Sequence, residues 1–129
     1  MNNKGKTRIL VVDDEPDVRR LIQILMQDSG YEIIEAAAGR ELLEKLETPP
    51  LPDLILLDVL MPGMNGYEAC RKIKENKRLE KICVAMYSSL PEDELKIGAQ
   101  KAGADAYITK NIDIFKLAKK IVSLLPAKQ

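Results

Sequence analysis

Residues 54–58 read Leu-Ile-Leu-Leu-Asp, a short apolar run that ends in a carboxylate. Three other segments repeat this pattern: residues 9–12 precede Asp13 and Asp14, residues 82–87 precede Ser88, and residues 106–109 precede Lys110. Short apolar runs rich in β-branched residues, separated by helical patterns, indicate buried parallel strands. Functional groups of such sheets lie beyond the carboxyl ends of the strands. We therefore expect three carboxylates, a hydroxyl and an ammonium group at one edge, a set that suits a divalent cation and a phosphoryl group.

Strand and helix patterns alternate five times, which predicts an α/β fold with a doubly wound, five-stranded parallel sheet covered on both faces. The remaining strand is expected at residues 31–35. Helices are expected from residue 16 towards Gly30, at about 40–47, around 69–75, at about 91–102, ending at Gly103, and from 114 to about 125. In the third helix, Ala69, Cys70 and Ile73 are expected to face inward, whereas Arg71, Lys72, Lys74 and Glu75 face outward. The fourth helix has a weak apolar stripe, which predicts a loosely held element.

The chain has 129 residues, which favours one domain. We expect it at residues 8–125, between a flexible N-terminus at 1–7 and a tail at 126–129. Lys plus Arg and Asp plus Glu both number 20, so no charge bias points to direct nucleic acid binding or to an anionic membrane. The absence of histidine excludes a histidine phosphodonor, a histidine-based hydrolase and a His-ligated zinc site. Isolated Cys70 and Cys83 predict buried free thiols, and no leader or membrane span is visible, so we expect a cytoplasmic protein.

Asp13 and Asp14 form an adjacent pair of carboxylates that repel each other and need a counter-charge. Taken alone, an Asp before Glu-Pro is explained equally well as a helix N-cap, and Asp58 alone could open a turn. Ser88 alone is a common turn residue, and Lys110 alone is usually a solvated lysine. Brought together, the three Asp residues favour a Mg²⁺ site, and Lys110 becomes their counter-ion and a clamp for phosphate.

Several motifs of nucleotide and phosphate chemistry are missing. The chain has neither a G-x-x-x-x-G-K-[ST] loop nor a G-x-G-x-x-G turn after a strand. Phosphatases of the haloacid dehalogenase type use a second Asp two positions after the nucleophile as a general acid, and Leu60 occupies that position here. A turnover enzyme is therefore not expected.

Together, these residues resemble the receiver domain of two-component response regulators. Asp13 and Asp14 resemble the acidic metal-binding pair. Asp58, with Met61-Pro62 and Gly66 after it, resembles the phosphoacceptor segment D-x-x-M-P-x-x-x-G. Ser88 matches the hydroxyl position of the family, and the small residue Ser89 follows it. Tyr107 matches the aromatic switch position, and Lys110 matches the lysine of the family. The separations are 45 residues from Asp13 to Asp58, 30 more to Ser88 and 22 more to Lys110. The resemblance implies a flavodoxin-like sheet with strand order 2-1-3-4-5.

The resemblance also implies a function. A sensor histidine kinase or a phosphotransfer protein would donate a phosphoryl group to Asp58. Mg²⁺ would be held by Asp14, Asp58 and the Leu60 backbone carbonyl, with Asp13 in support, and Lys110 and Ser88 would bind the phosphoryl oxygens. The leading hypothesis is a stand-alone phospho-switch that acts on an unknown protein target. The alternatives are a phosphorelay intermediate and, disfavoured by Leu60, a phosphatase-like enzyme.

Two further expectations concern the C-terminal part of the chain. The fourth helix, last strand and last helix, residues 92–125, are expected to form the output face, which carries both charge signs and would bind a partner or a second copy in a homodimer. The alternative is that these charges are only a solvated surface. The lysine of the family is usually followed by a cis proline, but Asn111 follows Lys110 here. Because a cis bond without proline costs about 3 kcal/mol, we expect a trans peptide.

Overall fold

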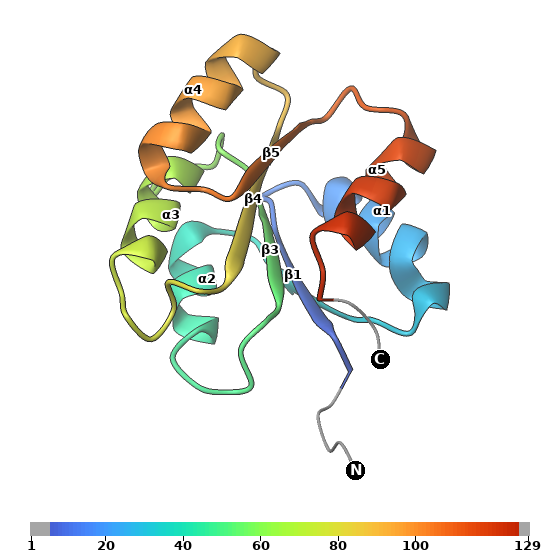
Figure 1. Ribbon diagram of the computed structural model, residues 1–129, viewed down its shortest axis with the longest axis horizontal. Coiled ribbons are helices and arrows are strands. Elements are labelled where there is room, and N and C mark those ends of the chain that lie inside the picture. Colours follow the sequence, from blue (N-terminus) through green and yellow to red (C-terminus); the bar gives the residue numbers. More distant parts are fainter. Residues whose placement is uncertain (1–5, 127–129) are drawn as a thin grey trace.

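Five parallel strands form one sheet in the order β2-β1-β3-β4-β5 in the computed structural model, which describes residues 6–126 (Figure 1). The strands are β1 (Arg8–Val12), β2 (Glu32–Ala36), β3 (Leu54–Leu57), β4 (Cys83–Ser88) and β5 (Ala106–Thr109). The helices are α1 (Pro16–Met26), α2 (Gly39–Lys45), α3 (Gly66–Lys74), α4 (Glu92–Ala102) and α5 (Ile114–Ser123), and a 3₁₀ turn, Gln27–Ser29, follows α1. The doubly wound fold and the strand order are confirmed. The expected flexible ends lie mostly outside the described residues.

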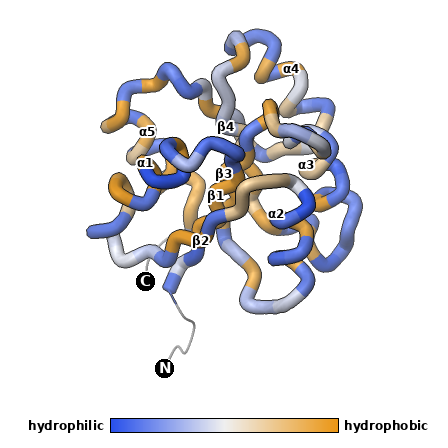
Figure 2. Tube along the Cα trace, turned by 180° about the vertical axis from the view of Figure 1, so that it is seen from behind, coloured by the Kyte–Doolittle hydropathy of each residue, from blue (hydrophilic) through white to orange (hydrophobic). Residues whose placement is uncertain are grey.

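The strands are apolar throughout because helices cover both faces of the sheet. Alternate side chains face opposite ways along each strand, so that Leu10 and Ile55 contribute to the core under α2, α3 and α4, while Ile9 and Leu54 contribute to the core under α1 and α5. Figure 2 shows the hydrophobic strands at the centre of the molecule, surrounded by more hydrophilic helices and loops. Because the strands are parallel, their carboxyl ends share one edge of the sheet.

Local sequence signals set most of the helix ends. The Asn65 side chain accepts a hydrogen bond from the Glu68 amide at 3.0 Å and caps α3, and the Asp113 side chain caps α5 in the same way. At the end of α4, Gly103 has a φ of +83°, which confirms the expected glycine stop. The second strand begins one residue later than expected, and the second helix is shorter, Gly39–Lys45 rather than 40–47.

Helix α4 is anchored by few apolar side chains. Leu95, Ala99 and Ala102 are buried, whereas Ile97 is 53% exposed. At Gly98 the helix approaches the ring of Tyr67 on α3 so closely that a Cβ atom would overlap it. The small number of large anchors agrees with the sequence pattern, and the ease with which α4 moves stays a prediction.

The prediction that Lys74 faces outward is wrong. Its Nζ donates to the carbonyl oxygens of Glu80 and Ile82, at 3.0 and 2.7 Å, and forms an ion pair with Asp105 at 2.7 Å. The same Asp105 carboxylate accepts from the Val84 amide at 2.9 Å. The long lysine side chain folds back because it satisfies three acceptors at the amino ends of β4 and β5.

Two smaller expectations also meet the structure. Cys70 is buried as expected, but Cys83 is only partly buried because it starts its strand. The Lys110–Asn111 peptide is trans, as predicted; within residues 6–126 the cis peptide is Pro49–Pro50. None of the helices in this described range is long and apolar enough to cross a membrane.

Gly66 offers a test of how closely α3 approaches the edge of the sheet. In Gly66→Ala the added methyl group would overlap the backbone carbonyl oxygen of Asp58, which cannot rotate away as a side chain can. We expect this substitution to lower the free energy of unfolding by about 3 kcal/mol, as measured by urea denaturation.

Gly39→Ala is the matched control, because Gly39 is also the first residue of its helix. Its methyl group would meet the flexible side chain of Met64 at 3.2 Å. We expect a change in unfolding free energy below about 1 kcal/mol there, since alanine also favours the helix. Equal losses in the two variants would contradict the special role of the Gly66 approach.

Candidate functional site

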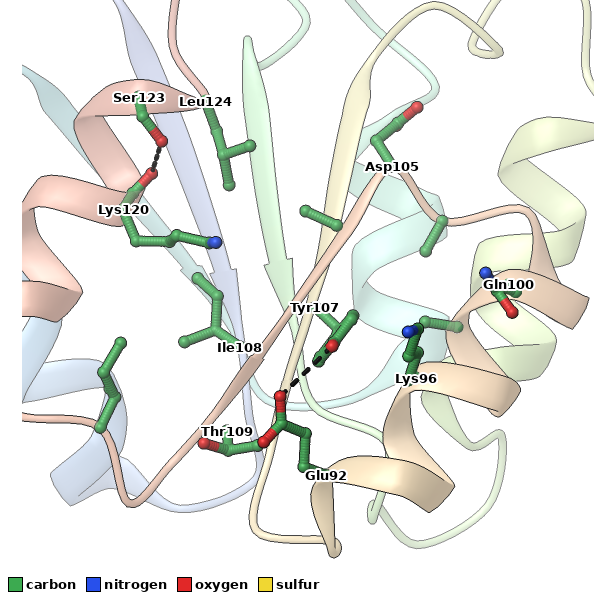
Figure 3. A pocket seen from close by; sticks show the side chains of 14 residues that line it. Glu92, Lys96, Gln100, Asp105, Tyr107, Ile108, Thr109, Lys120, Ser123 and Leu124 are labelled. Carbon is green, nitrogen blue, oxygen red and sulfur yellow. Dashed lines mark hydrogen bonds between the residues drawn. The ribbon is translucent and has the colours of Figure 1, made fainter.

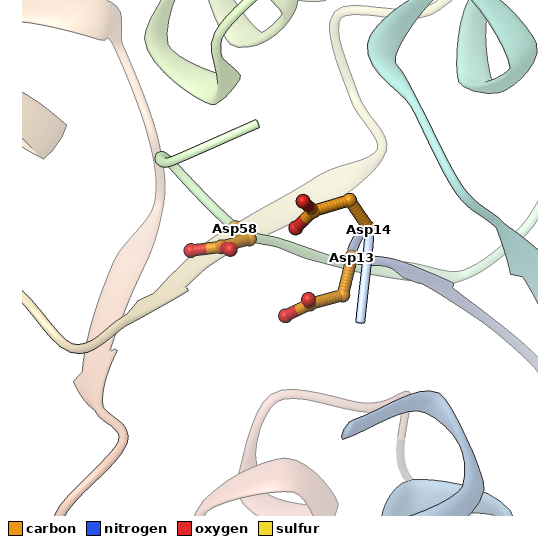
Figure 4. A group of neighbouring side chains, drawn as sticks. All are labelled: Asp13, Asp14 and Asp58. Carbon is orange, nitrogen blue, oxygen red and sulfur yellow. The ribbon is translucent and has the colours of Figure 1, made fainter. Parts of the chain in front are cut away.

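Three carboxylates converge where β1 and β3 end. One oxygen from each of Asp13, Asp14 and Asp58 lies within 4.8 Å of the others, and Figure 4 shows the Asp13 and Asp14 side chains directed towards Asp58. The strands place them through backbone hydrogen bonds that continue past their ends: the Asp13 amide donates to the Ala36 carbonyl at 3.1 Å, and the Asp58 amide donates to the Val12 carbonyl at 2.9 Å.

Lys110 supplies the counter-charge. Its Nζ lies 2.7 Å from Asp13 Oδ2 and 3.4 Å from Asp58 Oδ2. The Lys110 backbone amide donates to the Ser88 carbonyl at 2.8 Å, which extends the pairing of β4 with β5 and aims the side chain at the carboxylates. The ammonium group also lies 5.6 Å from the centroid of the Tyr87 ring.

Burial and charge act against each other in this cluster. Burial raises the pKa of Asp58; the Lys110 charge opposes this shift and the Asp13 charge adds to it, so that the pKa of Asp58 lies above its ordinary value. Burial alone would lower the pKa of Lys110, but its hydrogen bond to Asp13 and the negative charges of Asp58 and Asp13 raise it overall. The lysine is therefore a firmly charged partner.

The three carboxylates are held to different degrees. Asp13 is 1% exposed, and its other oxygen, Oδ1, accepts from the Glu15 amide at 2.9 Å. Asp58 is 4% exposed, and its Oδ1 accepts from the Leu60 amide at a longer 3.4 Å. Asp14 is exposed. The N-cap alternative is wrong, because the N-cap residue of α1 is Glu15, and it makes no side-chain cap.

The other residues singled out in the sequence lie at varying positions relative to the cluster. Ser88 is fully buried at the end of β4, where its hydroxyl accepts from the Leu90 amide at 3.3 Å. Ser89 is exposed. The Tyr107 hydroxyl donates to Glu92 on α4 at 3.3 Å and lines a groove of about 600 Å³ between α4, β5 and α5 (Figure 3). The structure therefore brings Lys110 to the three carboxylates but not Tyr107.

Sequence reasoning missed three contributors. Glu15 supplies an amide to Asp13, Tyr87 lies beside the Lys110 ammonium, and Arg19 donates to the Asp13 carbonyl at 2.7 Å. Tyr87 has the only sequence signal, because it directly precedes Ser88 at the end of a buried run. The contacts of Glu15 and Arg19 depend on how α1 leaves the strand, which residue types alone do not reveal.

The ligand atoms offered by the cluster fit a hard divalent cation. They are carboxylate oxygens on two neighbouring strands, and an oxygen set of this kind suits Mg²⁺ or Ca²⁺ rather than zinc, which favours imidazole and thiolate. The chain has no histidine, and both cysteines belong to the part of the structure around Lys74 and Asp105. The acidic cluster can therefore hold a metal ion of the magnesium class.

Comparisons with known proteins agree with this geometry. The family model described as the response regulator receiver domain matches residues 9–122. The transcriptional regulatory protein ResD of Bacillus subtilis is 37% identical over 126 residues, which make up 97% of this chain and 50% of that protein. Chemotaxis protein CheY4 of Vibrio cholerae is 29% identical with a TM-score of 0.84, over 94% of this chain and all (100%) of that one.

A further solved relative is the response regulator protein TrrA of Thermotoga maritima in complex with Mg²⁺-BeF. It is 34% identical with a TM-score of 0.79, over 92% of this chain and 99% of that chain. The chain spans about half the length of the curated regulators that it matches. Because the matched region runs from β1 into α5 and includes the whole acidic pocket, this chain belongs to the family of response regulator receiver domains.

Proposed function

We propose that this chain is a phospho-switch in which Asp58 accepts a phosphoryl group from a phosphohistidine of a sensor histidine kinase or phosphotransfer protein. A carboxylate oxygen of Asp58 forms the new bond to phosphorus while the bond between phosphorus and the donor imidazole breaks, and the leaving imidazole takes up a proton. The observation that carries this proposal is the buried Asp58 carboxylate, which lies beside both the Asp13–Asp14 pair and the Lys110 ammonium.

The hydrogen bonds favour Asp58 over its neighbours as the acceptor. Both oxygens of Asp13 are engaged at short range, one by Lys110 at 2.7 Å and one by the Glu15 amide at 2.9 Å. The contacts of Asp58 are longer, 3.4 Å to both Lys110 and the Leu60 amide. Asp58 therefore loses less hydrogen bonding when one oxygen becomes esterified, while Asp13 holds the lysine in place.

Several groups would act on the transferred phosphoryl group. Asp14, Asp58 and the Leu60 backbone carbonyl, with Asp13 in support, would hold Mg²⁺, which would supply positive charge that lowers the repulsion between the phosphoryl oxygens and the carboxylates. Lys110 and the Ser88 hydroxyl bind phosphoryl oxygens. The complex of TrrA with Mg²⁺-BeF supports this choice of metal, because that relative was solved with Mg²⁺.

We do not assign a turnover reaction to the pocket. A phosphatase of the haloacid dehalogenase type needs a proton donor two positions after its nucleophile, where this chain has Leu60. The Leu60 side chain is 53% exposed beside the pocket. It carries no titratable group, and we propose that it shields the acyl phosphate from water.

The donor would dock on the rim of the pocket. Leu60 on the β3–α3 loop is 53% exposed, and at the start of α5 Phe115 is 76% exposed and Ile114 is 42% exposed. These apolar side chains follow strands that end at the pocket, so a helical donor that presents phosphohistidine to Asp58 would bury them.

The output would leave through the α4–β5–α5 face, residues 92–125. The Ser88 hydroxyl, which accepts from the Leu90 amide, would move to donate to a phosphoryl oxygen at Asp58. Tyr107, hydrogen-bonded to Glu92 across the groove, is the side chain that can follow this change. Lys96 and Lys120 lie with Glu92 along the same groove, so the surface offers both charge signs to a protein partner or to a second copy.

Asn in place of Asp58 tests the acceptor directly. With acetyl phosphate and Mg²⁺, the wild-type protein should gain the mass of one phosphoryl group, whereas Asp58→Asn should gain none, as read by intact mass spectrometry. Asp28→Asn is the control. It removes an exposed carboxylate in the 3₁₀ turn after α1, and this variant should be phosphorylated as wild type is. A modified Asp58→Asn protein, or modification without Mg²⁺, would contradict the assignment.

Mg²⁺ should stabilise the folded protein, because it relieves the repulsion among the three carboxylates and binds only the native site. At a concentration one hundred times its Kd it adds about 2.7 kcal/mol to the unfolding free energy, which raises Tm by several degrees. In Asp14→Ala the metal-free protein should be as stable as wild type or more so, while the increment with Mg²⁺ shrinks. Asp17→Ala, at an exposed carboxylate in α1, should keep the increment; an undiminished increment in Asp14→Ala would place the cation elsewhere.

The output face can be located by amide chemical shifts with and without beryllofluoride in the presence of Mg²⁺. We expect changes beyond the pocket to gather in residues 92–120, because α4 has few large anchors and follows Ser88. The Asp58→Asn protein should show none of them. Changes that gather on α1 and leave residues 92–120 quiet would refute the proposed face.

A further inference from the structure

Arg19, in the first part of α1, makes two hydrogen bonds that connect α1 to two strands. Its Nη1 donates to the Asp13 backbone carbonyl at 2.7 Å, and its Nε donates to Glu35 Oε1 on β2 at 2.8 Å. The side chain is only 18% exposed, although most surface arginines are solvated. The planar guanidinium can present two nitrogens in fixed directions, which a single lysine ammonium cannot do.

Glu35 holds the guanidinium in this position. Its second oxygen accepts from Gln23 Nε2 at 3.1 Å, so both carboxylate oxygens are engaged by residues one turn apart on α1. The hydrogen bond from Arg19 lowers the pKa of Glu35 despite the opposing effect of burial, and the carboxylate stays ionised. Arg19 is thus fixed between a side chain on β2 and the backbone at the end of β1.

The acceptor on β1 belongs to the peptide that leads into Asp14. Because a peptide unit is planar, holding the Asp13 carbonyl also fixes the direction in which the chain enters Asp14. The Asp14 carboxylate needs such support. Asp13 is held by Lys110 and the Glu15 amide, whereas within residues 6–126 no hydrogen bond or ion pair holds the Asp14 side chain.

We propose that Arg19 is a positioning residue of the metal site: it holds the peptide between Asp13 and Asp14 so that the exposed Asp14 carboxylate stays beside Asp13 and Asp58 before the cation arrives. This inference rests on the proposed Mg²⁺ site. Arg19 acts through the backbone, as outer-shell groups act on metal ligands elsewhere.

A positioning role and a purely electrostatic role of Arg19 predict opposite changes in the Kd of Mg²⁺ when Arg19 is replaced. Removing a cation near three carboxylates strengthens the attraction of the site for Mg²⁺, so a purely electrostatic role predicts a lower Kd. Releasing the peptide lets Asp14 leave the ligand set, so the positioning role predicts a higher Kd. The sign of the change separates the two.

The test measures the Kd of Mg²⁺ by calorimetric titration, well below Tm, with the fold checked by amide spectra. Arg19→Met keeps the apolar stem but removes both donors, and we expect its Kd to rise roughly tenfold. Arg20→Met is the matched control, because it removes the same charge from the next, exposed position on α1. Its Kd should be unchanged or lower.

Three further variants sharpen the test. Arg19→Lys keeps the charge but only one donor position, and its Kd should lie between those of wild type and Arg19→Met. Glu35→Asp keeps the negative charge but shortens the anchor of the guanidinium and should also raise the Kd, which keeps the test decisive if Arg19→Met does not fold. In an Asp14→Ala background, Arg19→Met should cause no further loss, because the ligand that it positions is already missing.

The outcomes distinguish this inference from the function on which it rests. Wild-type protein that does not bind Mg²⁺ would show that both the metal site and the role of Arg19 are wrong. Wild-type binding with an equal or lower Kd in folded Arg19→Met would refute the role of Arg19 alone. A loss of the same size in Arg20→Met would refute it too, because the effect would then not depend on the hydrogen bonds that Arg19 makes to Asp13 and Glu35.

Discussion

Three carboxylates whose oxygens lie within 4.8 Å of one another repel, and the Lys110 ammonium is the interaction that offsets this repulsion. Its two partners, Asp13 and Asp58, are almost fully buried, so without it two negative charges would face each other in a poorly hydrated place. The parallel sheet makes this contact possible. Asp13, Asp58 and Lys110 directly follow β1, β3 and β5, so all three lie at the same edge of the sheet. The remaining negative charge is what a divalent cation can neutralise.

The two sides of this edge differ in how closely the backbone is constrained. On the β1–β3 side, Gly66 lies against the Asp58 carbonyl and Arg19 ties α1 to the end of β1, so the backbone around the carboxylates is closely constrained. On the β4–β5 side, α4 has small anchors, and the buried Ser88 hydroxyl is bonded only at 3.3 Å to a loop amide. We therefore expect a binding event at Asp58 to be accommodated by movement towards α4 rather than towards α1.

We expect partner recognition by this chain to depend on the side chains exposed near the pocket and along the α4–β5–α5 face. Leu60, Ile114 and Phe115 are exposed apolar side chains, and the groove beside Tyr107 carries both charge signs. The curated regulators that match this chain are about twice its length, so their activities do not transfer through the receiver domain alone. The kind of partner that this chain binds has to be inferred from its exposed apolar side chains and from the charged groove beside Tyr107.

The sequence by itself determined the fold and the main acidic residues, because both depend on local patterns. Apolar runs of strand length, amphipathic helices and stop signals such as Gly103 define the alternation of strands and helices, and parallel strands bring the residues after them to one edge. Asp13, Asp14, Asp58, Ser88 and Lys110 could therefore be expected at one edge of the sheet.

Only the tertiary structure decided which groups hold these residues. Arg19 reaches the Asp13 carbonyl and Glu35, Lys74 turns back onto Asp105, and Gly98 meets Tyr67, in each case across elements far apart in the chain. A charged residue on a helix follows the same sequence pattern whether its side chain is solvated or bonded to a neighbouring strand. The difference arises from the exact approach of one element to another, which packing sets and local sequence does not encode.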